Sequence, residues 1–76
     1  MWEKKAPKLV KEFKFKDFKQ AMEFVNKVAE IAEQLKHHPD IHIHYNRVVI
    51  ETWTHSENDI TQKDYKLAEE IDRIRV

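Results

Sequence analysis

The chain has 76 residues, and its 14 Lys and Arg residues balance 14 Asp and Glu residues, so the formal net charge is zero with His neutral. A neutral chain has no net field to attract nucleic acid or an anionic membrane, and we expect neither as a partner. The absence of Cys excludes disulfides, thiolate zinc sites and a thiol nucleophile. The length predicts a single domain over residues 1–76. The lack of an apolar run long enough for a signal peptide or a membrane helix favours a cytoplasmic location.

The first part of the sequence predicts a strand and then a long helix. Residues 9–15 (LVKEFKF) alternate apolar and charged side chains toward their end, as a half-buried strand does. Asp17 and Gln20 resemble a capping box at a helix start. Apolar residues at helical spacing then define the expected core face of the helix: Phe18, Ala21, Met22, Val25, Val28, Ala29, Ala32 and Leu35. Phe24 and Ile31 lie beside this face, where we interpret them as a surface that contacts another subunit.

A hairpin is expected after the helix. Pro39 ends the helix because it lacks an N–H and disfavours the α region for the residue before it. Residues 40–45 (DIHIHY) alternate, which places His42 and His44 opposite the apolar side chains. Asn46 is the expected turn residue before the returning strand. The faces of that strand are expected to hold Val48, Ile50, Thr52 and Thr54 on one side and Val49, Glu51, Trp53 and His55 on the other.

The last segment predicts a second helix. Thr61 and Asp64 form a capping box at its start, and the apolar residues that follow at helical spacing are Leu67, Ala68, Ile71 and Ile74. Because the chain contains no glycine, we expect Asn or Asp at any position with positive φ. The order strand, helix, strand, strand, helix predicts an α+β fold, in which an antiparallel sheet carries the helices on one face.

Two histidines of the hairpin admit two interpretations. His42 and His44 point the same way, and imidazole is a common neutral metal ligand. Two ligands are too few for a metal site, however, and the outer face of a half-buried strand needs polar residues. We therefore interpret this pair as a solvated strand face and expect no bound metal.

The other three histidines suggest proton transfer. His37 and His38 lie where the helix must end, and His55 follows the returning strand. If the sheet brings these ends together, three imidazoles meet, and their ordinary pKa of about 6.5 suits proton exchange at neutral pH. The alternative is that His37 and His38 only interact with the helix dipole. We interpret Glu33 as an exposed helix residue, and the alternative is that it orients His37 through an i, i+4 contact. The capping box is sufficient to explain Asp64.

Four stretches together carry a family resemblance: FKFKDFKQAMEFVNKVAEIAEQLKHHPD, YNRV, THS and ITQKDYKLAEEID. With the pattern E-x-x-x-H-H-P from Glu33 to Pro39, they make the chain resemble the pterin-4a-carbinolamine dehydratases from about Phe13 to Ile74. This fold is also called the dimerization cofactor of a homeodomain transcription factor. The resemblance implies a sheet of about four strands with two or three helices on one face, and a short first strand around Trp2 and Glu3.

The activity that the resemblance implies is that of a hydro-lyase. It removes water from a 4a-hydroxytetrahydropterin to give the quinonoid dihydropterin, by general acid-base catalysis without metal or cofactor. Carried over by position, the catalytic residues are His37, His38 and His55. The substrate-binding residues implied in the same way are Pro39, Thr54, Ser56, Asp64 and Glu33.

The same resemblance implies self-association. Members of the family form homodimers or homotetramers, so we expect an assembly of identical chains around a small pterin substrate. The alternative function is a non-catalytic interaction module that uses the apolar flank of the long helix, with Phe24 and Ile31 as the contact. A transcription-factor partner is the foreign protein that this alternative implies, and we favour self-assembly over it.

Overall fold

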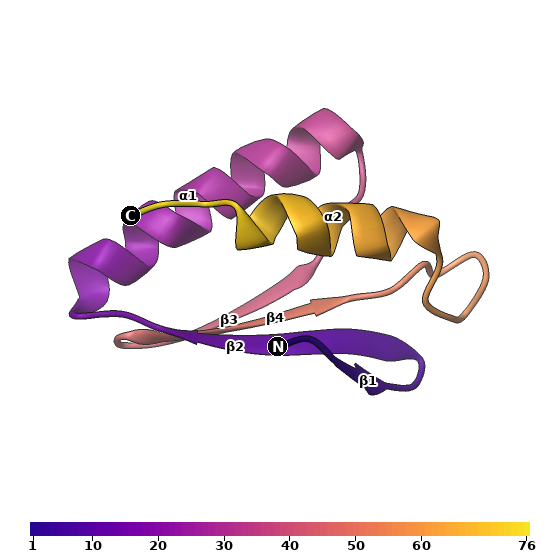
Figure 1. Cartoon of the computed structure of the whole chain (residues 1–76), viewed down its shortest axis with the longest axis horizontal. Coiled ribbons are helices and arrows are strands. Elements are labelled where there is room, and N and C mark those ends of the chain that lie inside the picture. Colours follow the sequence, from indigo (N-terminus) through magenta and orange to yellow (C-terminus); the bar gives the residue numbers. More distant parts are fainter.

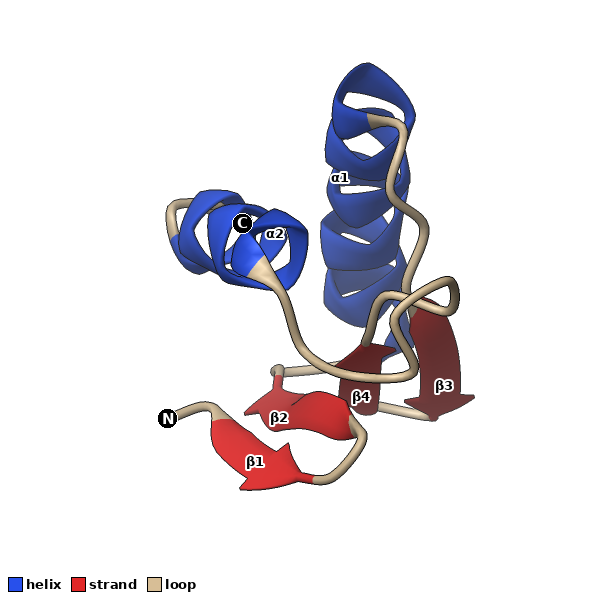
Figure 2. Ribbon diagram, turned by 90° about the vertical axis from the view of Figure 1, so that its right-hand side faces the viewer, coloured by secondary structure: helices blue, strands red, loops and turns tan.

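The computed structural model describes all 76 residues and forms one antiparallel sheet with two helices (Figure 1). The strands are β1 (Glu3–Lys5), β2 (Lys8–Lys14), β3 (Asp40–His44) and β4 (Arg47–Thr52), and their order in the sheet is β1-β2-β4-β3. The helices are α1 (Phe18–Leu35) and α2 (Gln62–Asp72). Both helices lie on the same face of the sheet (Figure 2). The predicted α+β class and the short first strand are confirmed, and there are two helices.

Alternation in β4 produces the buried layer beneath the helices. Val48, Ile50 and Thr52 are fully buried, whereas the residues between them are partly exposed. Opposite Val48 stand Phe13 of β2 and Ile43 of β3. The predicted hairpin is therefore confirmed, with Val48, Ile50 and Thr52 on the helix-facing side, but β4 ends at Thr52, and Thr54 forms only an isolated bridge with Asp59. Neither helix combines the length and the apolar composition that crossing a membrane requires.

The core face of α1 differs from the predicted one. Phe24 is only 3% exposed and packs against Phe13 and Phe15, with ring centroids 4.7 Å and 4.9 Å away. Ile31 is partly buried against the same core, whereas Phe18 is 49% exposed. Phe13 of β2 and Phe15, just after β2, determine which side of α1 faces the core, and the spacing of apolar residues along the helix does not show this. Our assignment of Phe24 to an exposed interaction surface is wrong, and the alternative interaction module loses its principal contact.

Both predicted helix starts are confirmed. Asp17 caps α1 by accepting a hydrogen bond from the backbone N–H of Gln20. Thr61 and Asp64 form a complete capping box on α2, with each side chain bonded to the other residue's backbone N–H. These local bonds satisfy donors that the first helical turn leaves free.

Three residues have positive φ: Lys36 (53°), Tyr45 (52°) and Asn58 (51°). The expectation of Asn or Asp is correct for Asn58 and wrong for the other two. Lys36 adopts this conformation at the end of α1, where its N–H bonds the carbonyl oxygens of Ala32 and Glu33. The tight reversal places His37 directly after the helix.

Replacing Lys36 with Gly is expected to stabilise the fold by about 1 kcal/mol, because a residue with a Cβ pays about 1–2 kcal/mol in the left-handed region while Gly pays none but loses more entropy on folding. The melting temperature would rise by about 4–8 °C in a domain of this size. Thermal unfolding followed by circular dichroism measures the change. Lys36→Ala removes the same charge but keeps the Cβ, so an equal gain in that variant would contradict the explanation.

Candidate active site

A buried carboxylate joins the ends of three elements. Asp64, in the first turn of α2, is 0% exposed. Its Oδ1 lies 2.6 Å from Thr52 Oγ1 and 2.6 Å from His37 Nε2. Its Oδ2 lies 2.8 Å from Thr54 Oγ1 and 2.9 Å from the backbone nitrogen of Thr61. One side chain therefore connects the end of α1, the end of β4 and the start of α2.

The hydrogen bonds keep this carboxylate ionised. Burial raises the pKa of Asp64, but the bonds from Thr52, His37, Thr61 and Thr54 outweigh burial and hold the pKa below its ordinary value of 3.8. An ionised carboxylate can only accept hydrogen bonds, so the proton between the two groups belongs to His37 Nε2. Neutral His37 then carries a free lone pair on Nδ1, which makes no hydrogen bond within the chain.

This arrangement predicts a loss of stability in acid. Because the folded-state pKa of Asp64 is below 3.8, the ionised carboxylate stabilises the fold above that value. The stabilisation is lost as the pH falls through the lowered pKa. Urea unfolding from about pH 6 to about pH 3 measures it, with Asp64→Asn as the reference because that variant has no carboxylate. The stability difference between wild type and variant should shrink in acid, and a constant difference would contradict the assignment.

The end of α1 directs its two histidines to different partners. The backbone N–H of His37 bonds the carbonyl of Ala32 at 3.1 Å, and its side chain, 13% exposed, contacts α2. His38 Nε2 lies 2.5 Å from Glu33 Oε2, and both of these side chains are largely exposed. The interpretation of Glu33 as an exposed helix residue is confirmed. The alternative that it orients His37 is wrong, because Glu33 contacts His38, which follows the left-handed Lys36.

Two adjoining pockets lie at the start of α2. The larger one, about 360 Å³, is lined by Thr54, Ser56, Glu57, Thr61, Gln62 and Lys63. The smaller one, about 280 Å³, is lined by Leu35, His37, Gln62, Lys63 and Lys66. Gln62 and Lys63 border both pockets, and the remaining lining is polar except for Leu35. His37 lines the smaller pocket, and Thr54 and Ser56 line the larger one. Three predicted site residues, His37, Thr54 and Ser56, line the pockets. Asp64 lines neither pocket, but it is bonded to His37 and Thr54.

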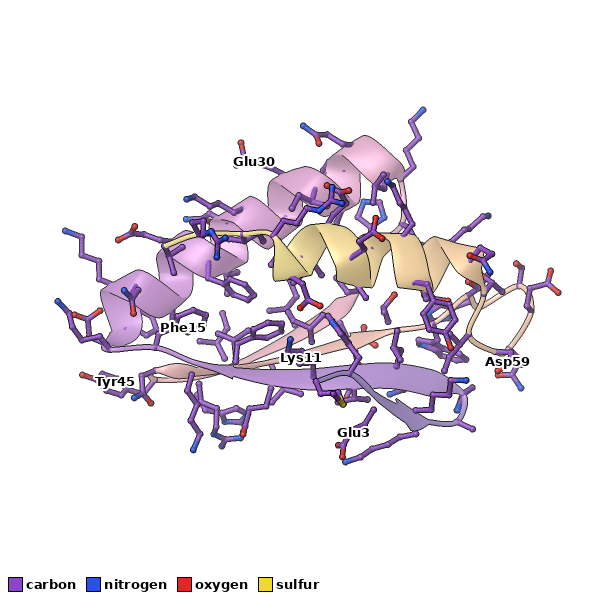
Figure 3. All side chains as sticks on the ribbon, viewed as in Figure 1. Glu3, Lys11, Phe15, Glu30, Tyr45 and Asp59 are labelled. Carbon is purple, nitrogen blue, oxygen red and sulfur yellow. The ribbon has the colours of Figure 1, made fainter.

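The remaining predicted histidines lie outside the hydrogen-bonded cluster. His55 is exposed and stacks on Trp53, with ring centroids 4.0 Å apart. His55 begins the loop that contains Asp59. Figure 3 shows Asp59 at the opposite end of the molecule from Tyr45, which lies in the turn of the hairpin. Neither His55 nor His38 lines either pocket. Pro39 follows His38 as a half-buried residue.

Sequence reasoning missed two features of this site. Asp64 is more than a helix cap, because its oxygens also bind side chains from β4 and from the end of α1. Thr52 was placed on the helix-facing side of its strand but not in the site. A buried hydroxyl needs a hydrogen-bond partner, so a threonine on the buried face of this strand could have indicated a polar group nearby.

The hairpin histidines lie on the open face of the sheet. His42 Nε2 is 3.4 Å from Glu51 Oε1, which also contacts Lys8 Nζ at 3.0 Å. The hydrogen bond from Lys8 lowers the pKa of Glu51 most, with partial burial opposing it and His42 adding to it. No group of three His, Asp or Glu side chains in the chain is placed to hold a metal ion.

Comparison with known proteins connects this geometry to one family. Residues 1–74 match the family described as pterin 4 alpha carbinolamine dehydratase. A protein of Sulfolobus acidocaldarius is 49% identical over 74 residues, which are 97% of this chain and 81% of that protein. One from Thermomicrobium roseum is 49% identical over 70 residues, covering 92% of this chain and 75% of the relative. Both are named, provisionally, pterin-4-alpha-carbinolamine dehydratases.

Two solved structures share the fold. A Brucella melitensis protein described as a transcriptional coactivator/pterin dehydratase superposes with a TM-score of 0.88 at 41% identity, over 93% of this chain and 78% of its own. A pterin dehydratase-like protein described as a RuBisCO assembly factor of the alpha-carboxysome superposes with a TM-score of 0.76 at 23% identity. It covers 95% of this chain and 83% of its own, and at this identity the likeness concerns the fold alone.

Proposed function

Because this chain belongs to the pterin 4 alpha carbinolamine dehydratase family, we propose that it dehydrates a 4a-hydroxytetrahydropterin to the quinonoid dihydropterin. In this reaction the bond between C4a and the hydroxyl oxygen breaks, and the hydroxyl leaves as water after gaining a proton. The N5 proton is removed, and its electron pair forms the new double bond to C4a. The reaction needs one proton acceptor and one proton donor.

The observation that carries the proposal is the bond between His37 and the buried, ionised Asp64 at the edge of a polar pocket. An ionised carboxylate on Nε2–H stabilises the imidazolium that forms when Nδ1 takes up a proton. We assign His37 the role of accepting the N5 proton. The proton for the leaving hydroxyl is assigned to His38 or His55, the other two predicted catalytic histidines. Thr54 and Ser56 would contact the polar edge of the pterin.

A stopped-flow assay of carbinolamine loss tests the proposal. The wild-type chain should accelerate dehydration in proportion to its concentration and release the quinonoid dihydropterin. An equal concentration of an unrelated histidine-containing protein provides the control for catalysis by free imidazole. No acceleration by folded wild-type protein would overturn the proposed activity. The cytoplasmic location and the homodimer or homotetramer remain predictions.

A further inference from the structure

Thr52 is a buried hydroxyl at the centre of the site. It is the last residue of β4 and is 0% exposed. Its Oγ1 donates to Asp64 Oδ1 at 2.6 Å, and this is the oxygen that also receives the N–H of His37. The two other donors, Thr54 Oγ1 and the backbone N–H of Thr61, bind Oδ2. Thr52 is therefore the one residue that shares an oxygen with His37.

Packing alone does not require a hydroxyl at this position. The neighbours of Thr52 on the same strand face, Val48 and Ile50, are apolar and fully buried, and Leu9 stands opposite it on β2. Valine has nearly the same shape as threonine and would fill the space without a polar atom. A buried hydroxyl is costly unless it is hydrogen-bonded, and Asp64 supplies the acceptor.

We propose that Thr52 is a positioning residue for the proposed dehydration: by fixing Asp64 Oδ1, it holds the ring of His37 with Nδ1 available to the pocket. This inference rests on the proposed function for its kinetic consequence. Its structural consequence is a change in the pKa of Asp64, which can be measured whether or not the protein turns over a substrate.

The charge on Asp64 gives Thr52 a second effect. Burial is the largest influence on the pKa of this carboxyl and raises it, and the hydrogen bond from Thr52 is the largest of those that lower it. Without the hydroxyl, the pKa of Asp64 should rise toward its ordinary value. His37 is the titratable side chain that contacts this carboxylate, so protonation of Asp64 would release the ring.

Three variants separate the hydroxyl from the volume that it fills. Thr52→Val removes the hydroxyl and keeps the shape, whereas Thr52→Ser keeps the hydroxyl. Ile50→Val is the matched control, because it removes one buried methyl group from the same strand face without touching the polar cluster. For each protein, kcat and KM for dehydration are measured against pH, and the Asp64 carboxyl is titrated by ¹³C NMR.

Thr52→Val is expected to lower kcat about 10- to 100-fold, the equivalent of one hydrogen bond to a charged group, with KM changed less than about twofold. In this variant the ¹³C titration midpoint of Asp64 should move to higher pH. The acid limb of the profile of kcat against pH should move in the same direction. Thr52→Ser should resemble wild type in both measurements. Ile50→Val should keep the wild-type kcat and titration.

The outcomes distinguish this inference from the proposed function. A wild-type chain without dehydratase activity would overturn the function, and the ¹³C titration would still decide whether Thr52 controls Asp64. An active wild type whose kcat and Asp64 titration are unchanged by Thr52→Val would overturn the role of Thr52. If Thr52→Val does not fold, Thr52→Ala and Thr52→Ser make the same comparison, since they differ by the hydroxyl alone.

Discussion

Replacing His37 with Gln is expected to lower kcat for dehydration about 10²- to 10⁴-fold, the usual contribution of a positioned acid-base group. The Gln side-chain amide can still donate a hydrogen bond to Asp64, so the buried carboxylate keeps its fourth partner. The amide does not titrate, however, and cannot accept a proton from N5. The loss should appear in kcat rather than in stability, and stopped-flow kinetics with circular dichroism of the same samples would measure both.

His42→Gln is the matched control for this prediction. It makes the same chemical change on the open face of the sheet, where His42 contacts Glu51. This variant should retain the wild-type kcat. Equal losses in the two variants, or a His37→Gln protein with the activity of wild type, would remove His37 from the proposed chemistry.

Replacing Asp64 with Asn is expected to destabilise the fold by about 2–4 kcal/mol at neutral pH. The carboxylate accepts four hydrogen bonds in a fully buried position, and a bond to a charged group is worth about 1.5–3 kcal/mol. An amide has a single acceptor oxygen, and its NH₂ group would face a donor that cannot reverse, such as the backbone N–H of Thr61. Urea unfolding followed by circular dichroism would measure the loss.

Asp17→Asn is the control for the Asp64 variant. Asp17 also accepts a hydrogen bond at a helix N-terminus, but Asn is an equally good residue at an N-cap. This variant should therefore lose little stability. A loss in Asp64→Asn no larger than that in Asp17→Asn would mean that Asp64 stabilises the fold only as a helix cap.

The fold was predictable where its signals are local. The capping residues Asp17 and Thr61 and the alternation of β4 each act within a few residues, so their patterns can be read from the sequence. The core face of α1 was not predictable in this way. Apolar residues cover much of that helix, and its contact with Phe13 of β2 and with Phe15 just after β2 determines that Phe24 faces inward.

The site was partly predictable for the same reason. His37 and Asp64 were each identified, but 27 residues separate them, and their contact depends on how α1 and α2 are packed. The reversal at Lys36 could not be read from the residue type, because a residue with a Cβ is uncommon at positive φ. That reversal decides which histidine reaches Asp64 and which reaches Glu33.

The most direct test of the account is to find where a pterin binds. The protein would be labelled with ¹⁵N in its histidine rings and titrated with a dihydropterin, the product class of the proposed reaction. Before the addition, neutral His37 should carry its proton on Nε2, because Asp64 accepts from that nitrogen. On binding, the Nδ1 resonance of His37 should change most, with His42 and His44 unaffected. A proton on Nδ1 in the free protein, or changes confined to the open-face histidines, would contradict the account.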